Sequence, residues 1–176
     1  MTYKTVLVHV DNGKYCPARL NMAIHLARRF DAHLVGLHAL TAVRLPAYAI
    51  AEAGATLIEA QKAIAREQAS GAENLFRKAT GGSGLANVEW RISADDAVDA
   101  TTLHARYADV VVLGQPREHD GSGVDMDFPE RVVLAAGRPV LMVPYAGKFE
   151  GVGKRVLVGW DARREATRAL TDAIPL

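Results

Sequence analysis

The feature that most constrains the fold of this chain is a regular alternation of short β-branched runs with longer amphipathic stretches. The runs indicate strands at 5–10, 33–40, 88–92, 109–113 and 139–143, and the amphipathic stretches indicate helices at 16–30, 51–79, 94–107 and 129–136. Helices that recur between strands are typical of βαβ units, in which the strands lie parallel. The alternation therefore predicts an α/β domain built on an open parallel sheet.

Two of the expected strands differ in their hydrophobic pattern. Val88, Trp90 and Ile92 alternate with Glu89 and Arg91, which predicts a half-buried strand near a sheet edge. Residues 109–113 instead form a nearly continuous apolar run, as in central parallel strands that are buried on both faces.

Composition narrows the classes of partner and compartment. The chain has 21 basic and 20 acidic side chains, so its net charge is only +1. This charge produces no overall electrostatic attraction to nucleic acid or to a membrane surface. No apolar run approaches the roughly 20 residues of a membrane span, and no signal segment opens the chain. The single cysteine, Cys16, excludes an internal disulfide framework and fits a reducing compartment. We therefore expect a cytoplasmic protein that binds neither nucleic acid nor membranes.

An internal repeat determines the expected domain organisation. The segment 4–11 recurs as 154–161, including the final aspartate, and residues 165–173 then follow a helical pattern. We expect one domain over 1–146, a linker over 147–153, and the first strand and helix of an incomplete second repeat over 154–176. Because a strand and a helix cannot form a domain alone, this second unit is either the remnant of a tandem protein or a segment that docks on the first domain. We favour truncation of a tandem protein.

Three motifs together carry a resemblance to a known family. They are the first strand ending in Asp11, the segment ADVVVLG at 108–114, and the segment GRPVLMVP at 137–144. Their order and spacing resemble the universal stress protein (UspA) family, here the first half of a tandem-type member. The resemblance implies a flavodoxin-like sheet of five parallel strands in the order 3-2-1-4-5, with helices on both faces. In such a sheet a ligand binds outside the carboxyl ends of the strands at the switch point, where Asp11 and Gly114 should face each other.

The resemblance also implies which part of a nucleotide site is altered. Family members that bind ATP share a glycine pattern after the fourth strand, which ends in glycine and serine or threonine and holds the phosphates through backbone N–H groups. Here Arg117 stands at the second glycine, and the last pair falls within a residue of Met126-Asp127-Phe128. A carboxylate about 4 Å from a phosphate costs on the order of 4 kcal/mol at an effective dielectric constant near 20, which Arg117 and Arg131 would offset only in part.

We therefore expect ATP binding to be weak or absent, and no cofactor, although Asp11 matches the position where the family's aspartate contacts adenine. The candidate ligand-binding residues lie around the switch point: Asp11, Asn12, Gly13, Gly114, Gln115, Pro116, Arg117 and Asp127.

Other reactive side chains favour structural roles. His9 lies inside the first strand, where a core histidine is more common than a metal ligand, and the remaining histidines lack metal-site spacing. Cys16 is near a helix start but has no histidine partner suggested by the sequence, so a buried or helix-capping cysteine is favoured over a reactive one. Asp125 and Asp127 are expected to be solvated or to cap a helix rather than to form a catalytic pair. No catalytic or metal residue is assigned.

Three functions remain open. The leading one is a non-catalytic stress-response module that binds a small molecule or a partner at the switch point. The alternatives are an ATP-binding switch or slow ATPase, and a structural half of a tandem protein. For any of them the apolar strand at 139–143 is expected to pair two chains as a homodimer.

Overall fold

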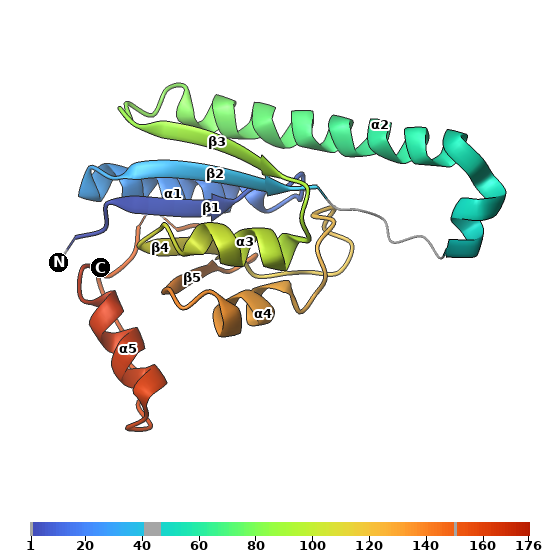
Figure 1. Ribbon diagram of the computed structural model, residues 1–176. Helices are drawn as coiled ribbons and strands as arrows, with labels where there is room; N and C mark the ends of the chain where they lie inside the picture. The colour runs from blue at the N-terminus through green and yellow to red at the C-terminus, as the bar shows by residue number, and fades with distance from the viewer. Residues whose placement is uncertain (1, 41–46, 150) are drawn as a thin grey trace.

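The computed structural model describes residues 2–40, 47–149 and 151–176, and it contains a parallel sheet with helices on both faces (Figure 1). The elements in chain order are β1 (Thr5–His9), α1 (Cys16–Phe30), β2 (His33–Ala39), α2 (Ala47–Thr80), β3 (Val88–Ser93), α3 (Ala97–Ala105), β4 (Val110–Gly114), α4 (Phe128–Ala135), β5 (Val140–Val143) and α5 (Arg164–Ala173).

The sheet has five strands in the order β3-β2-β1-β4-β5. All four pairings are parallel, with Val8 opposite Gly36 of β2 on one side and Val112 of β4 on the other. The strand order reverses between β1 and β4, because the chain builds outward from β1 first on one side and then on the other. This is the flavodoxin-like arrangement that the resemblance implies, and the expected switch point is confirmed.

Two apolar layers form the core, one on each face of the sheet. Val6, Val8 and Val10 face α1 and α2, where Leu20 and Phe76 pack against them. Leu7 and Val111 face α3 and α4, together with Phe128 and Val132. Successive residues of a strand point to opposite faces, so the apolar runs of β1 and β4 supply both layers at once.

The boundaries of most elements lie within a few residues of the sequence predictions. Helix α1 begins at Cys16 with Pro17 in its first turn, and its last turn is followed by Asp31 in the left-handed conformation at φ 50°. Helix α2 starts at Ala47 rather than at the expected residue 51, and its first part extends beyond the carboxyl ends of the strands (Figure 1). Strand β3 is an edge strand, as the alternation of its residues predicts.

The second-repeat segment forms only half of what the sequence predicts. Helix α5 forms, but residues 154–160 do not form a strand. The prediction of a strand there is therefore wrong. A strand requires a neighbouring strand for its backbone N–H and C=O groups, and this segment pairs with none within the described residues. Leu157 is 98% exposed, and Val156 and Trp160 are also mostly exposed.

Contacts near the two ends of the segment attach it to the domain. Arg29 of α1 donates hydrogen bonds to the backbone oxygens of Val152 and Leu176, and the Tyr3 hydroxyl donates to the backbone oxygen of Asp172. A cavity of about 790 Å³ remains between α5 and the β5 side of the sheet. The docked segment is therefore anchored at few points and leaves α5 without a buried residue.

Candidate functional site

The site at the carboxyl ends of the strands is built around Asp11, two residues after β1. The Asp11 carboxylate is buried, with 2% of the residue exposed. Its Oδ1 accepts a hydrogen bond from the backbone N–H of Gly13 at 2.8 Å, and its Oδ2 pairs with Nη2 of Arg19 at 2.7 Å. His9 Nδ1 lies 3.5 Å from the same Oδ2. Asp11 is thus fully engaged by groups of its own chain.

The two charges of this ion pair stabilise each other inside the protein. Burial by itself raises the pKa of Asp11, but the guanidinium of Arg19, His9 and the Gly13 N–H outweigh it and lower the pKa. For Arg19 burial alone would lower the pKa, and the Asp11 charge raises it. Both groups therefore remain charged at neutral pH.

Arg19 also links Asp11 to Gly114, the last residue of β4. A Cβ atom built on Gly114 would overlap Nη1 of Arg19, so the guanidinium lies directly against the backbone of β4. Asp11 and Gly114 are therefore at the same end of the sheet, on either side of one guanidinium. This agrees with the switch-point geometry expected from the sequence.

The loop over residues 115–127 covers the chain that follows β1. The Lys14 N–H donates to the backbone oxygen of Asp120, and a Cβ on Gly13 would lie 3.1 Å from Ser122. Asn12 points the other way, toward α2, where its Nδ2 donates to the backbone oxygen of Gln68. The absence of a side chain at Gly13 thus permits close contact between the two segments.

The remaining predicted site residues lie farther out. The Gln115 N–H donates to the backbone oxygen of Val143, Pro116 is half-buried, and Arg117 is exposed. The Arg117 guanidinium donates to the Tyr15 hydroxyl at 2.8 Å and lies 5.1 Å from the centre of the Tyr145 ring. Its charge is therefore held on the surface by two tyrosines.

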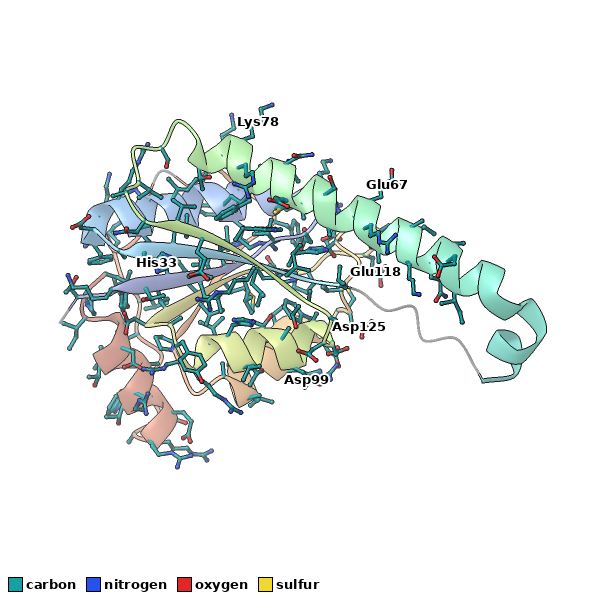
Figure 2. The ribbon with its side chains drawn as sticks, turned by 45° about the horizontal axis from the view of Figure 1, so that its top comes forward. His33, Glu67, Lys78, Asp99, Glu118 and Asp125 are labelled. Carbon is teal, nitrogen blue, oxygen red and sulfur yellow. The ribbon has the colours of Figure 1, made fainter. Side chains whose placement is uncertain are left out.

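Asp127 occupies the N-cap position of α4 without a side-chain capping bond, and its carboxylate lies 3.9 Å from Arg131. Asp127 therefore lies at a helix-capping position, as expected from the sequence, but its side chain does not make the capping hydrogen bond. Figure 2 shows Glu118 and Asp125 of the same loop beyond the carboxyl ends of the strands, so this end of the molecule carries several carboxylates.

Comparison with protein-family models matches residues 2–144 to the universal stress protein family. The chain belongs to this family. No curated protein matches the chain significantly.

Solved structures of universal stress proteins share the fold. A UspA from Lactobacillus plantarum is 20% identical, with a TM-score of 0.65, over 81% of this chain and 99% of its own. A universal stress protein from Burkholderia pseudomallei is 21% identical, with a TM-score of 0.53, over 81% and 96% of the two chains. A third, described as a complex with cAMP, is 21% identical, with a TM-score of 0.53, over 83% and 100%. At these identities the likeness establishes the fold.

Arg19, which contacts both Asp11 and Gly114 in this universal stress protein domain, was not predicted from the sequence as a site residue. A signal was present, because Arg19 falls three residues after Cys16 and four before Ala23, on the apolar stripe of α1. A charged residue on a buried stripe requires a partner, and Asp11 at the end of the preceding strand was an available carboxylate.

His9 and Cys16 lie beside this site and are both buried, as expected for core residues. Burial lowers the pKa of His9 to about 3, although the charge of Asp11 acts to raise this pKa. The His9 ring is therefore neutral. Burial also raises the pKa of the Cys16 thiol. Across residues 2–40, 47–149 and 151–176 no three His, Cys, Asp or Glu side chains gather as a metal site would need.

Proposed function

We propose that this universal stress protein domain is a non-catalytic binding or regulatory module whose carboxyl-end site holds ATP weakly or not at all. The observation that carries the proposal is Asp127 at the N-cap of α4. A helix N-terminus attracts phosphate through its free N–H groups and its dipole, and a carboxylate there competes for the same groups. The site therefore lacks the strongest phosphate-binding feature of an open α/β sheet.

The surroundings of Asp127 support the same reading. Arg131 lies 3.9 Å from Asp127, and Arg117 is bound to Tyr15 and Tyr145, so these two arginines already have partners. Glu118 and Asp125 add negative charge at this end (Figure 2). A triphosphate at this end would therefore lie near carboxylates, and Arg117 and Arg131 would have to give up their present partners to bind it.

Isothermal titration calorimetry with Mg²⁺ and ATP tests the proposal directly. We expect no saturable heat below millimolar ATP, which corresponds to a binding free energy weaker than about −4 kcal/mol. Asp127→Ser restores a hydroxyl at the N-cap and removes the charge, so it should bind ATP about tenfold or more tightly than the wild type.

Glu130→Ser is the matched control, because Glu130 is also an acidic residue in the first turn of α4. A micromolar dissociation constant for the unaltered chain would contradict the proposal and move an ATP-binding switch or slow ATPase to first place. The observation that favours this second candidate is the structural likeness to a universal stress protein described as a complex with cAMP.

The compartment belongs to the same proposal. A buried thiol in a chain with a single cysteine is compatible with the reducing cytoplasm, where we place the protein. Among the described helices none combines the length and the apolar character of a membrane-crossing segment. Fractionation of cells that express a tagged full chain checks the location.

A further inference from the structure

We propose that the cavity between α5 and the β5 side of the sheet binds a free medium-chain carboxylate, that is, a small anion with one apolar tail. The cavity has a volume of about 790 Å³. Small-molecule pockets commonly measure about 300–1,000 Å³, and their walls are mostly apolar with a few well-placed polar groups. The cavity is separate from the carboxyl-end site, so binding here does not depend on whether that site holds ATP.

The cavity lies at the amino ends of the strands. Its wall includes Tyr3, two residues before β1, together with Val110 and Val140, which are the first residues of β4 and β5. Figure 1 shows α5 beside these amino ends. The Asp11 site lies at the other end of the sheet, where the strands finish. The two sites are therefore separated by the length of the strands.

The wall on the sheet side is apolar and suits a hydrocarbon tail. Val110 is buried, and Val140 and Leu141 are half-buried. Val133 and Leu134 of α4 line the same space, and Leu134 is 87% exposed. Covering these side chains with a hydrocarbon chain removes apolar surface from water, which is favourable roughly in proportion to the area covered. This wall therefore provides a driving force for binding an apolar tail.

One face of α5 forms the opposite wall and carries the polar groups. The lining residues of this helix recur at the three-and-four spacing of a single helical face: Arg164, Glu165, Arg168, Ala169, Asp172 and Ala173. Among the described residues none of α5 is buried. A ligand in the cavity would therefore cover part of a helix face that the chain itself leaves open.

The arginines of α5 are available to a carboxylate head group. Arg164 pairs with Glu165 at 2.9 Å and Arg168 pairs with Asp172 at 3.4 Å, and both arginine side chains are largely exposed. Ion pairs between exposed side chains contribute little to stability. Either arginine can therefore exchange its present partner for the carboxylate of a ligand with little loss.

Arg138, between α4 and β5, determines the charge of the expected ligand. Among the described residues no carboxylate pairs with Arg138, whose Nη2 donates to the backbone oxygen of Arg106 at 3.1 Å. A guanidinium has further N–H donors in a planar fork that matches the two oxygens of a carboxylate. An arginine without an acidic partner beside an apolar wall favours an anionic head group over a cationic or neutral one.

Isothermal titration calorimetry of the full chain with sodium decanoate tests the inference. We expect saturable binding below millimolar decanoate. Decyltrimethylammonium has the same tail with a cationic head and should bind about tenfold or more weakly. Hexanoate should also bind about tenfold or more weakly, because each buried methylene group contributes about fourfold in affinity. Decanoate should in addition slow tryptic cleavage at Lys154 and Arg155, since it connects α5 to the sheet.

Two variants change the cavity, and each has a matched control. Arg138→Glu reverses an exposed charge, so it should bind decanoate about tenfold or more weakly than the wild type and decyltrimethylammonium more tightly. Arg163→Glu, at an exposed arginine that does not line the cavity, should bind as the wild type does. Ala169→Phe fills the cavity and should weaken decanoate binding about tenfold, whereas Thr167→Phe, on α5 but outside the lining, should not.

Three results would overturn the inference. The first is the absence of saturable decanoate binding to the folded wild type. The second is equal decanoate binding by the wild type, Arg138→Glu and Ala169→Phe, because the ligand would then lie elsewhere. The third is a decanoate effect confined to the mass measured by light scattering, which would make a second copy of the chain the occupant of the cavity. ATP binding is measured separately, so each of these results leaves the proposed function standing.

Discussion

His9 lies in the interior beside the Asp11–Arg19 ion pair, and this position determines its charge. Burial, with smaller effects of Arg19 and His38, lowers its pKa to about 3, although Asp11 acts in the opposite direction. Its ring also packs 4.8 Å from that of Phe128. The folded protein therefore keeps His9 neutral in a range where an unfolded chain would protonate it.

The stability of the protein should consequently fall on mild acidification. The unfolded chain takes up a proton on His9 near pH 6.5 and the folded chain only near pH 3, so stability from this residue is complete above about pH 6.5 and declines below it. The slope approaches about 1.4 kcal/mol per pH unit below pH 6. Urea unfolding at pH 7, 6 and 5 should show this loss in the wild type.

His9→Gln removes the titrating ring and should flatten the dependence between pH 6.5 and 5. The slopes are compared between pH 6.5 and 5 because Asp11, whose pKa is lowered, changes the stability only at more acid pH. His104, whose pKa is also lowered by burial, remains in both proteins and cancels in the difference. Equal slopes in wild type and variant would show that His9 is protonated in both states or in neither.

At the scale of elements, α5 and the chain before it are the least integrated part of the described structure. The connection depends on Arg29, which bonds the oxygens of Val152 and Leu176, and on the Tyr3 hydroxyl. All four large apolar side chains over 156–160 are exposed. Such a segment opens locally at a lower free energy than the sheet.

Arg29→Ala should release this segment. Loss of a hydrogen bond worth about 1 kcal/mol increases the open population about fivefold, so trypsin should cleave at Lys154 and Arg155 about five times faster. Arg28→Ala is the matched control, since Arg28 bonds Ser83 instead. Cleavage that is equally fast in the wild type and in both variants would mean that the contacts of Arg29 do not hold the segment.

At the scale of the whole molecule, the β5 side of the sheet exposes backbone and apolar surface together. Within the described residues β5 pairs with β4 alone. Leu134 of the adjoining α4 is 87% exposed, and Val133 and Met142 are also exposed. The cavity between this side and α5 adds apolar lining from Val140 and Leu141. An exposed edge strand with apolar neighbours favours pairing with another chain.

We therefore propose a homodimer formed through β5. Size-exclusion chromatography with light scattering at micromolar concentration should give the mass of two chains, because burial of a few hundred Å² of apolar surface contributes several kcal/mol at about 25 cal/mol per Å². Met142→Glu should shift the protein to monomer. Ile64→Glu, which places the same charge on an exposed isoleucine of α2, should remain a dimer. A monomeric wild type would exclude this assembly.

The strands and helices could be predicted from the sequence because each is encoded by a hydrophobic pattern within a few consecutive residues. The continuous apolar run of residues 109–113 and the alternation of Val88, Trp90 and Ile92 report burial on two faces or on one, and the structure places them in a central and an edge strand. Each depends on side chains within a few residues, where periodicity reflects the geometry of strand and helix. The strand order and the switch point then followed from the family resemblance.

The state of the site was decided only by tertiary structure. The sequence identified Asp11 and Gly114 but could not show that Arg19, in a different element, lies between them. The segment 154–160 repeats the sequence of β1 and yet forms no strand, because a strand exists only with neighbouring strands to pair with. Which strands and which charges come together depends on the packing of distant segments, and no pattern within one segment contains that information.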